Sequence, residues 1–243
     1  MSRDMTRLVL LHGFTQTRQS WRRTVAALGG RYRAIAPDLP GHGSAAQRRP
    51  ASFNACVAYV RAIGGDEFTL VGYSMGGRIA LAAALALPSQ VRRLVLVGAS
   101  PGIADPGERA ARRRVDDELA QRIEAIGIEA FAREWGAQAL FAGQDERVAA
   151  AADADRLRNE PAGLAAALRG LGTGVMEPLW DRLDSLAIPV TLVVGERDAK
   201  FSAIADQMAA RIPDAHVVVI AGAGHAAQLE RPGEVAAAIT DTP

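Results

Sequence analysis

The residues Gly72-Tyr73-Ser74-Met75-Gly76 place a serine between two glycines, where one residue pattern gives way to another. The segment before Ser74, "EFTLVGY", favours a strand, and the Ala/Leu-rich segment 75–87 favours a helix. A G-x-S-x-G sequence at such a junction is the pattern of a nucleophile elbow, a strained turn that exposes the serine hydroxyl. The start of the helix would also direct backbone N–H groups towards an oxyanion beside Ser74. The pattern predicts a reactive serine.

An activated serine needs a general base, and the chain has four histidines that must be considered: His12, His42, His216 and His225. The α/β-hydrolase order is serine, acid, histidine, and His225 satisfies it with Asp198 as the acid. All three residues lie at the carboxyl ends of predicted strands, where open α/β sheets bind ligands. An aspartate after a strand usually serves only the turn, and a lone loop histidine is usually a surface residue. Three such placements in the right order predict a Ser74–His225–Asp198 triad.

The segment "LLHGF", at the end of the first predicted strand, is the expected source of a second oxyanion donor. By the logic of this fold, the backbone N–H groups of Phe14 and Met75 form the oxyanion hole. His12 is then a structural residue of the loop.

Arg78 lies one helical turn beyond Ser74 and has apolar neighbours in "GGRIALAAALA". An arginine on a helix is usually a surface residue, but these neighbours predict a buried helix. An unpaired guanidinium there would be costly. We therefore expect Arg78 to pair with a carboxylate of a ligand through a forked contact.

Six apolar segments are expected to form the strands that position these residues: 7–11, 32–39, 67–73, 91–99, 188–198 and 215–225. Helical patterns separate them, at 20–28, 52–63, 75–87, between the last two strands, and from about Pro232 onwards. Strands that alternate with helices predict a mostly parallel sheet with helices on both faces, as in the α/β-hydrolase fold.

The alternation stops between residues 103 and 182, where the patterns are helical with Gly and Pro between them. The main helical segments are "RAARRRVDDELAQRIEAIG", "IEAFAREWGAQALF" and "LAAALRGLG". The sheet needs both halves of the chain, so we expect an α/β core formed by 1–102 and 183–243. The segment 103–182 is expected to be a helical lid inserted after the strand at 91–99.

Composition narrows the functional classes. The 243 residues carry a formal net charge of +1, so no global charge points to nucleic acid or an anionic membrane. Cys56 is the only cysteine, which excludes an intrachain disulfide and a Cys-rich metal site. No secretory leader and no membrane span is expected, and the predicted location is the cytoplasm. The sequence carries no signal for the oligomeric state.

Several motifs occur together, in order, and carry a more specific resemblance: "LHGFTQT…SW", "APDLPGHG", "VGYSMGGRIAL", "SPGI…ERAARRRVDDELA", "FAREW", "LRNEPAGLAAALRGLGTG", "PLWDRL", "GERDAKF" and "GAGHAAQLERP". Over roughly residues 8–235 the chain resembles the 2-succinyl-6-hydroxy-2,4-cyclohexadiene-1-carboxylate synthases of menaquinone biosynthesis. The resemblance implies elimination of pyruvate from 2-succinyl-5-enolpyruvyl-6-hydroxy-3-cyclohexene-1-carboxylate, a small polycarboxylate. Ser74, with His225, would then act as a base. No metal or organic cofactor is implied.

The same resemblance implies roles for further residues. Arg112 and Arg158 match carboxylate-binding positions of the family, Tyr73 and Trp135 match pocket walls, and Lys200 matches a substrate-binding position.

The residues themselves leave a simpler interpretation open for some of these positions. Arg112 is spaced to form i,i+4 ion pairs with Glu108 and Asp116, which would contribute only a few tenths of a kcal/mol on a solvated helix. Lys200 is equally compatible with an ordinary surface lysine.

Two other functions use the same residues. A serine hydrolase acting on a small carboxylate-bearing ester or a C–C bond needs the same triad and oxyanion hole, so the fold alone does not decide. A non-catalytic binding protein of this fold would usually lack part of the triad. Cationic residues at position 78 and in the lid favour the lyase, since a hydrolase of neutral esters would need an apolar funnel there.

Overall fold

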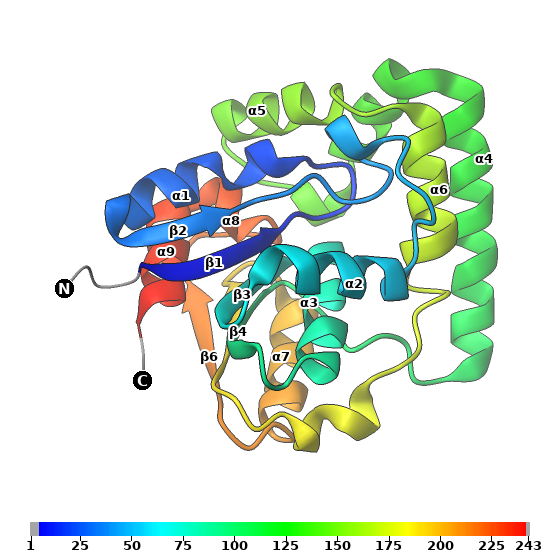
Figure 1. Ribbon diagram of the computed structural model, residues 1–243. Coiled ribbons are helices and arrows are strands. Elements are labelled where there is room, and N and C mark those ends of the chain that lie inside the picture. The colour runs from blue at the N-terminus through cyan, green and yellow to red at the C-terminus, as the bar shows by residue number, and fades with distance from the viewer. Residues whose placement is uncertain (1–4, 242–243) are drawn as a thin grey trace.

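The computed structural model describes residues 5–241 and is built on a six-stranded sheet, in the order β2-β1-β3-β4-β5-β6 (Figure 1). All five strand pairings are parallel. The strands are β1 (Thr6–Leu11), β2 (Tyr32–Ile35), β3 (Phe68–Tyr73), β4 (Val91–Val97), β5 (Val190–Gly195) and β6 (Ala215–Ile220). The parallel arrangement with helices on both faces agrees with the fold expected from the sequence.

Successive side chains of the central strands enter two different cores, because neighbouring residues of a strand point to opposite faces. On one face, side chains such as Val9, Leu70 and Leu94 pack against α2 (Phe53–Gly64), α3 (Met75–Ala86) and α7 (Ala199–Ala209). On the other face, Leu8, Val71 and their equivalents pack against α1 (Arg22–Leu28), α8 (Ala227–Glu230) and α9 (Pro232–Thr240). Figure 1 shows α1 beside α9 on that second face.

The observed strands are shorter than the sequence patterns at their carboxyl ends. The apolar patterns reach residues 39, 99, 198 and 225, whereas β2, β4, β5 and β6 end at Ile35, Val97, Gly195 and Ile220. Past these points the chain leaves the ladder for the loops that follow the strands. Likewise, the predicted helix at 20–28 begins as a 3₁₀ turn over Arg18–Trp21 before α1.

Three helices lie between β4 and β5 in the sequence: α4 (Pro106–Gly136), α5 (Glu146–Arg156) and α6 (Pro161–Leu171). In Figure 1, α4 and α6 stand side by side next to the sheet, and α5 lies above α1. Gly127, with φ 77° and ψ 174°, divides α4 at the boundary between two of the predicted helical segments. Helix α5 was not among the main segments expected from the sequence. That α4–α6 form a lid with boundaries at 103 and 182 stays a prediction.

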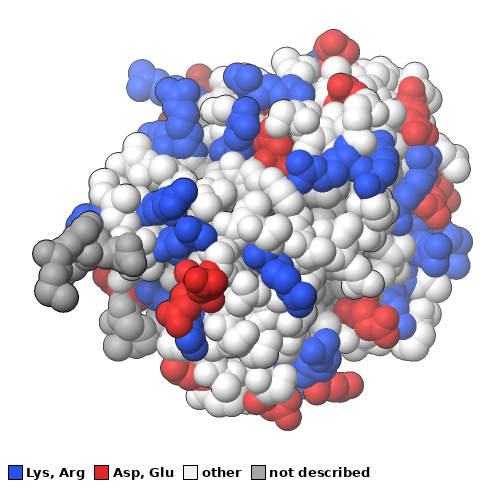
Figure 2. Space-filling view, in the orientation of Figure 1, with Lys and Arg blue, Asp and Glu red and all other residues white. Residues whose placement is uncertain are grey.

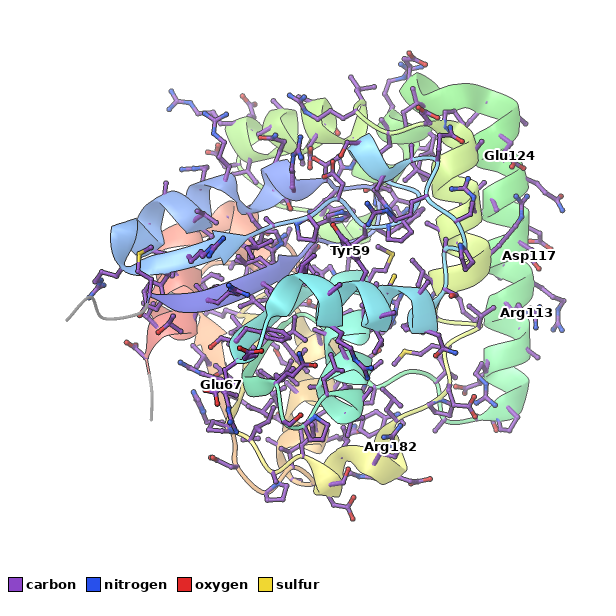
Figure 3. All side chains as sticks on the ribbon, viewed as in Figure 1. Tyr59, Glu67, Arg113, Asp117, Glu124 and Arg182 are labelled. Carbon is purple, nitrogen blue, oxygen red and sulfur yellow. The ribbon has the colours of Figure 1, made fainter. Side chains whose placement is uncertain are left out.

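The outer face of α4 is charged. Arg113 and Asp117 project from it away from the sheet (Figure 3), whereas Glu124 forms an ion pair with Arg169 of α6. Acidic and basic side chains are interspersed along this edge (Figure 2). Among residues 5–241, no helix is long and apolar enough to cross a bilayer. The described part of the chain leaves out residues 1–4 and 242–243. These residues belong to the predicted core, and residues 1–4 also begin the segment that was considered for a secretory leader.

Candidate active site

Ser74 forms the turn between β3 and α3, with backbone angles φ 50° and ψ −110°. A side chain on Gly72 would place its Cβ 2.4 Å from the carbonyl oxygen of Gly76. A Cβ on Gly76 would lie 2.3 Å from the carbonyl oxygen of Leu11 in the neighbouring strand. Gly76 is therefore needed for the close approach of the turn to β1, and Gly72 for the close approach of β3 to the start of α3. A non-glycine residue at positive φ is strained, and such strain persists where the surrounding structure holds it.

The structure brings Ser74, His225 and Asp198 together. His225 Nε2 lies 3.2 Å from Ser74 Oγ, and His225 Nδ1 lies 2.7 Å from Asp198 Oδ2. His225 and Asp198 are buried. Because the carboxylate only accepts, Nδ1 carries the proton and Nε2 is left to accept one from the serine hydroxyl. This is the geometry of a serine activated by a base that a third group orients.

A buried carboxylate behind the site connects the loops that carry the acid and the histidine. Glu230 Oε2 accepts hydrogen bonds from Arg197 Nη2 at 2.6 Å and from the backbone N–H of Gly224 at 2.9 Å. Arg197 directly precedes Asp198, and Gly224 directly precedes His225. Our sequence analysis missed Glu230. Its only sequence signal is its position five residues after His225.

The two predicted oxyanion donors line the same cavity as Ser74. Phe14 follows β1 and Met75 begins α3, and within residues 5–241 neither backbone N–H donates to a protein acceptor. His12 supports this loop from behind: Nδ1 donates to the carbonyl oxygen of Gly13 at 2.9 Å, and Nε2 accepts from the Leu39 N–H at 3.0 Å. Burial lowers the pKa of His12, which keeps the ring neutral. Its placement is that of a structural residue.

The cavity beside Ser74 has a volume of about 400 Å³ and lies between the sheet and the inserted helices. The core contributes residues at the ends of β1, β3, β4, β5 and β6, and the inserted segment contributes much of the opposite wall. The lining residues used below are Phe14, Ser74, Met75, Arg78, Arg112, Trp135, Thr173, Lys200, Phe201 and His225.

Arg78 enters this cavity with neutral partners only. Nη1 donates to Thr173 Oγ1 at 2.7 Å, Nη2 donates to the carbonyl oxygen of Leu171 at 2.8 Å, and Nε has no partner within residues 5–241. Burial and the nearby charge of Arg112 lower the pKa of Arg78 to about 10, so the group is still charged at neutral pH. The side chain is half-buried and its hydrogen-bond partners are neutral, although the Asp116 carboxylate is close enough to raise its pKa; a ligand carboxylate in the cavity would complete its environment.

The structure brings three more of the predicted residues to the cavity: Arg112, Trp135 and Lys200. Arg112 Nε donates to Asp116 Oδ1 at 2.7 Å, so the i,i+4 pair is formed while Arg112 also lines the cavity. Asp116 Oδ2 accepts from the Gly174 N–H at 3.2 Å, next to the threonine that holds Arg78. One buried carboxylate therefore organises the surroundings of both arginines.

Tyr73 and Arg158 are not placed in the cavity lining. The Tyr73 ring packs beside His225, with ring centroids 5.3 Å apart, and burial raises its pKa, so it supports the site from behind. The side chain of Arg158 is 59% exposed and lies 3.8 Å from Asp155. It lines a separate surface pocket with Arg18. The Arg158 side chain points outwards and does not line the cavity beside Ser74, so its role in substrate binding stays a prediction.

The donor set does not resemble a metal centre. Among residues 5–241, no three or more His, Cys, Asp or Glu side chains are grouped so that they could hold a metal ion. Cys56 is buried in α2, and burial raises the pKa of its thiol to about 12, which suits a core residue.

Residues 8–238 match the model of the alpha/beta hydrolase family. The chain is 35% identical over 235 residues to the putative 2-succinyl-6-hydroxy-2,4-cyclohexadiene-1-carboxylate synthase of Bacillus subtilis, covering 93% of this chain and 85% of that protein. It is also 35% identical to the synthase of that name from Escherichia coli O1:K1, covering 96% of this chain and 91% of the relative.

Solved structures give the same picture. MenH from S. aureus superposes with a TM-score of 0.91 at 32% identity, covering 98% of this chain and 92% of that one. A malate-bound thermophilic esterase from Thermogutta terrifontis superposes with a TM-score of 0.80 at 30% identity, covering 96% of this chain and 88% of the esterase.

Proposed function

The chain belongs to the α/β-hydrolase family and, within it, to the 2-succinyl-6-hydroxy-2,4-cyclohexadiene-1-carboxylate synthases; on this premise we propose that it is a carbon–oxygen lyase. Its substrate would be 2-succinyl-5-enolpyruvyl-6-hydroxy-3-cyclohexene-1-carboxylate, from which it eliminates pyruvate to form the cyclohexadiene product. The observation that carries the proposal is the half-buried guanidinium of Arg78, which lines the Ser74 cavity and donates hydrogen bonds to neutral partners only.

The substrate has three carboxylates, and the cavity offers three cations to receive them. Arg78 and Arg112 line the part of the cavity near Thr173. Lys200 lies at the start of α7, two residues after Asp198. Charge-assisted hydrogen bonds to carboxylates are roughly twice as strong as neutral ones, and a guanidinium can make two in parallel. We assign Arg78 and Arg112 to carboxylate binding and Lys200 to a further carboxylate, with Trp135 as an apolar wall.

Ser74 acts as the base in this reaction. The ring proton beside the succinyl ketone is acidic, because its loss leaves an enolate. Ser74 Oγ removes this proton while His225 Nε2 takes the hydroxyl proton across the 3.2 Å hydrogen bond. Asp198 stabilises the imidazolium that forms. No bond between Ser74 and substrate carbon is made.

The N–H groups of Phe14 and Met75 hold the enolate oxygen as its charge develops. The electron pair of the broken C–H bond then moves through the ring double bond and expels the enolpyruvyl oxygen. The leaving enolate of pyruvate takes a proton from solvent at carbon, which gives pyruvate. His225 holds the abstracted proton until product release and then gives it to solvent. The reaction neither oxidises nor reduces the substrate, so it needs no redox cofactor. We place this activity in the cytoplasm.

The second candidate is a serine hydrolase of a small carboxylate-bearing ester. Its support is the similarity to the T. terrifontis esterase, whose structure contains malate, and the hydrogen-bonded Ser74–His225–Asp198 arrangement. In that case Ser74 would attack a carbonyl carbon and form an acyl-enzyme. Arg78 would still bind an acidic substrate, so the two candidates differ in the fate of Ser74.

Pyruvate release tests the proposal. The enolpyruvyl substrate, generated in situ, is supplied to the wild type and to Ser74→Ala, and pyruvate is followed through lactate dehydrogenase and NADH. We expect rapid release by the wild type and loss of about 10³-fold or more in Ser74→Ala. Wild-type release no faster than in the absence of protein would refute the lyase.

A further inference from the structure

The last turn of α5 and the connection from α5 to α6 are hydrogen-bonded to the loop that follows β1. Asp155 Oδ2 accepts from the Thr17 backbone N–H at 2.9 Å, and Asp155 Oδ1 accepts from the Thr17 hydroxyl at 2.5 Å. Four residues further on, Asn159 Nδ2 donates to the carbonyl oxygen of Thr15 at 2.8 Å. The loop from Gly13 to Thr17 carries Phe14, the proposed oxyanion donor. The inserted helices are thus joined to this loop through buried polar contacts.

The side-chain amide of Asn159 makes hydrogen bonds through both its nitrogen and its oxygen. Besides Thr15, Nδ2 donates to the carbonyl oxygen of Arg156 at 3.0 Å, and Oδ1 accepts from the backbone N–H of Gly43 at 3.0 Å. The side-chain orientation follows from these partners, because two of them only accept and one only donates. Asn159 is 4% exposed, and a fully satisfied buried amide fixes its neighbours strongly.

The Thr15 contact acts on a strained segment. Thr15 has φ 67°, in the left-handed region that β-branched residues rarely adopt. On the other side of Phe14, the carbonyl oxygen of Gly13 accepts from His12 Nδ1 at 2.9 Å and from the Gln16 N–H at 3.2 Å. Since the Gly13–Phe14 peptide is planar, these contacts fix the plane that carries the Phe14 N–H. The Asn159 contact holds the Thr15 carbonyl, on the C-terminal side of Phe14, and so limits rotation of the backbone that follows Phe14.

The same loop is held through its side chain. The Phe14 ring packs edge-on against Trp135 of α4, with centroids 5.2 Å apart, and against His42, with centroids 5.7 Å apart. His42 directly precedes Gly43, which Asn159 also holds. Asn159 therefore contacts the backbone at Thr15, directly after Phe14, and at Gly43, directly after the histidine whose ring packs against Phe14.

We propose that Asn159 is a positioning residue for the oxyanion hole: its amide holds Thr15 in the strained conformation that directs the Phe14 N–H towards the substrate. The proposal rests on the proposed function in one respect, that an enolate oxygen occupies this hole. An interaction made mainly in the transition state lowers kcat and leaves KM unchanged. Losing a whole oxyanion donor costs about 10²–10³-fold in kcat, so a displaced donor should cost about 10- to 100-fold.

The test uses Asn159→Ala and Asn159→Asp in the full-length chain. Asn159→Ala removes both contacts. Asn159→Asp keeps the acceptor for Gly43 but places a carboxylate oxygen against the Thr15 carbonyl, so both variants should release Thr15. With ¹⁵N-labelled phenylalanine the chain gives at most six phenylalanine amide signals, and a Phe14→Leu variant identifies the one from Phe14. We expect the Phe14 signal to shift or broaden in both variants, while the signals of the distant phenylalanines stay in place.

Pyruvate release supplies the second measurement. In both variants kcat should fall about 10- to 100-fold with KM changed less than about twofold. Asn54→Ala is the control: it removes the amide of an exposed asparagine on α2 and should change neither measurement. The amide signals do not depend on any activity, so they test Asn159 even if the lyase assignment fails.

Three results would overturn the proposal. The first is an unmoved Phe14 signal in both variants, whatever happens to kcat. The second is a shifted signal with unchanged kcat in an enzyme that releases pyruvate. The third is that neither variant folds, because Asn159 would then determine the fold as a whole.

Discussion

Arg78 Nη1 donates to the hydroxyl of Thr173 at 2.7 Å, across the boundary between α3 and the segment that follows α6. The second terminal nitrogen donates to the Leu171 carbonyl, so both hydrogen-bond partners of this half-buried cation are neutral. The contacts fix the direction of the guanidinium while leaving its charge unbalanced in the cavity beside Ser74. A carboxylate of the substrate would supply the missing charge.

Replacing Arg78 with Met tests this relationship. A hydrogen bond to a charged group is worth about 1.5–3 kcal/mol, so kcat/KM for pyruvate release should fall about 10- to 150-fold. The free energy of unfolding should fall by no more than about 1 kcal/mol, because the substitution also removes a half-buried charge that has no carboxylate hydrogen-bonded to it. Initial rates and urea unfolding measure the two quantities.

Arg113→Met is the matched control for Arg78→Met. Arg113 projects from the outer face of α4 (Figure 3) and is exposed. It should retain kcat/KM within about twofold of the wild type. Equal losses in the two variants would mean that overall charge, rather than the position of Arg78, attracts the substrate.

Arg112 and Arg158 should differ although the sequence assigned both to carboxylate binding. Arg112 lines the cavity beside Arg78, whereas Arg158 lines a separate surface pocket. We expect Arg112→Met to raise KM about tenfold and Arg158→Met to change it less than twofold. Steady-state kinetics of pyruvate release decides this, and a larger effect of Arg158→Met would show that the inserted helices rearrange when substrate binds.

Glu230 should influence turnover through the residues that precede Asp198 and His225. In Glu230→Gln the charged partner of Arg197 and Gly224 is lost, and we expect the free energy of unfolding to fall by about 1–3 kcal/mol. kcat should fall more than KM rises, since the loops that orient the triad loosen. The control is Glu234→Gln. Glu234 Oε2 lies 4.0 Å from Arg231 Nε at the surface, and loss of this ion pair should lower the free energy of unfolding by less than about 0.5 kcal/mol. Lower stability with unchanged kcat would contradict the positioning role.

His42 should make the fold sensitive to acid. Burial lowers the pKa of His42 from its ordinary value of 6.5 to about 3, so the unfolded chain binds a proton below pH 6.5 that the folded chain does not. The stability contributed by neutral His42 is therefore full above pH 6.5 and is lost as the pH falls towards 3, by up to about 1.4 kcal/mol per pH unit.

His42→Phe keeps an aromatic ring beside Phe14 and removes this titration. Urea unfolding between pH 4 and 6 should then show a shallower pH dependence, by about one proton. His12, whose pKa burial also lowers, should account for part of the slope that remains. An unchanged slope in His42→Phe would mean that His42 is not buried as a neutral ring.

The patterns of residues adjacent in the sequence were sufficient to predict where the strands, the helices of the core and the turn at Ser74 occur. The elbow could be predicted because its glycines, serine and flanking patterns are adjacent in sequence. Asp198 and His225 could be predicted because they follow apolar strands closely. The predicted strands extended too far at their carboxyl ends, since an apolar residue gives the same sequence pattern whether or not a neighbouring strand pairs with it.

Residues whose function depends on distant partners could not be predicted in the same way. Asn159 holds Thr15, and Glu230 holds Arg197, across 144 and 33 residues of chain. Arg158 lies outside the cavity, because matching a motif gives a position in the chain and not the direction of the side chain. Arg78 could be placed beside Ser74 because its apolar neighbours indicated a helix packed into the core, and its pairing with a substrate carboxylate stays a prediction.

The central claim, that Ser74 is a base for a carboxylated substrate, is tested most directly by comparing two reactions of one preparation. Pyruvate release from the enolpyruvyl cyclohexene substrate and hydrolysis of p-nitrophenyl butyrate are measured for the wild type and Ser74→Ala. The account predicts Ser74-dependent pyruvate release with kcat/KM at least about 10³-fold above that for the ester, because Arg78 has no partner in a neutral ester. Efficient ester hydrolysis without pyruvate release would contradict it and make Ser74 a nucleophile.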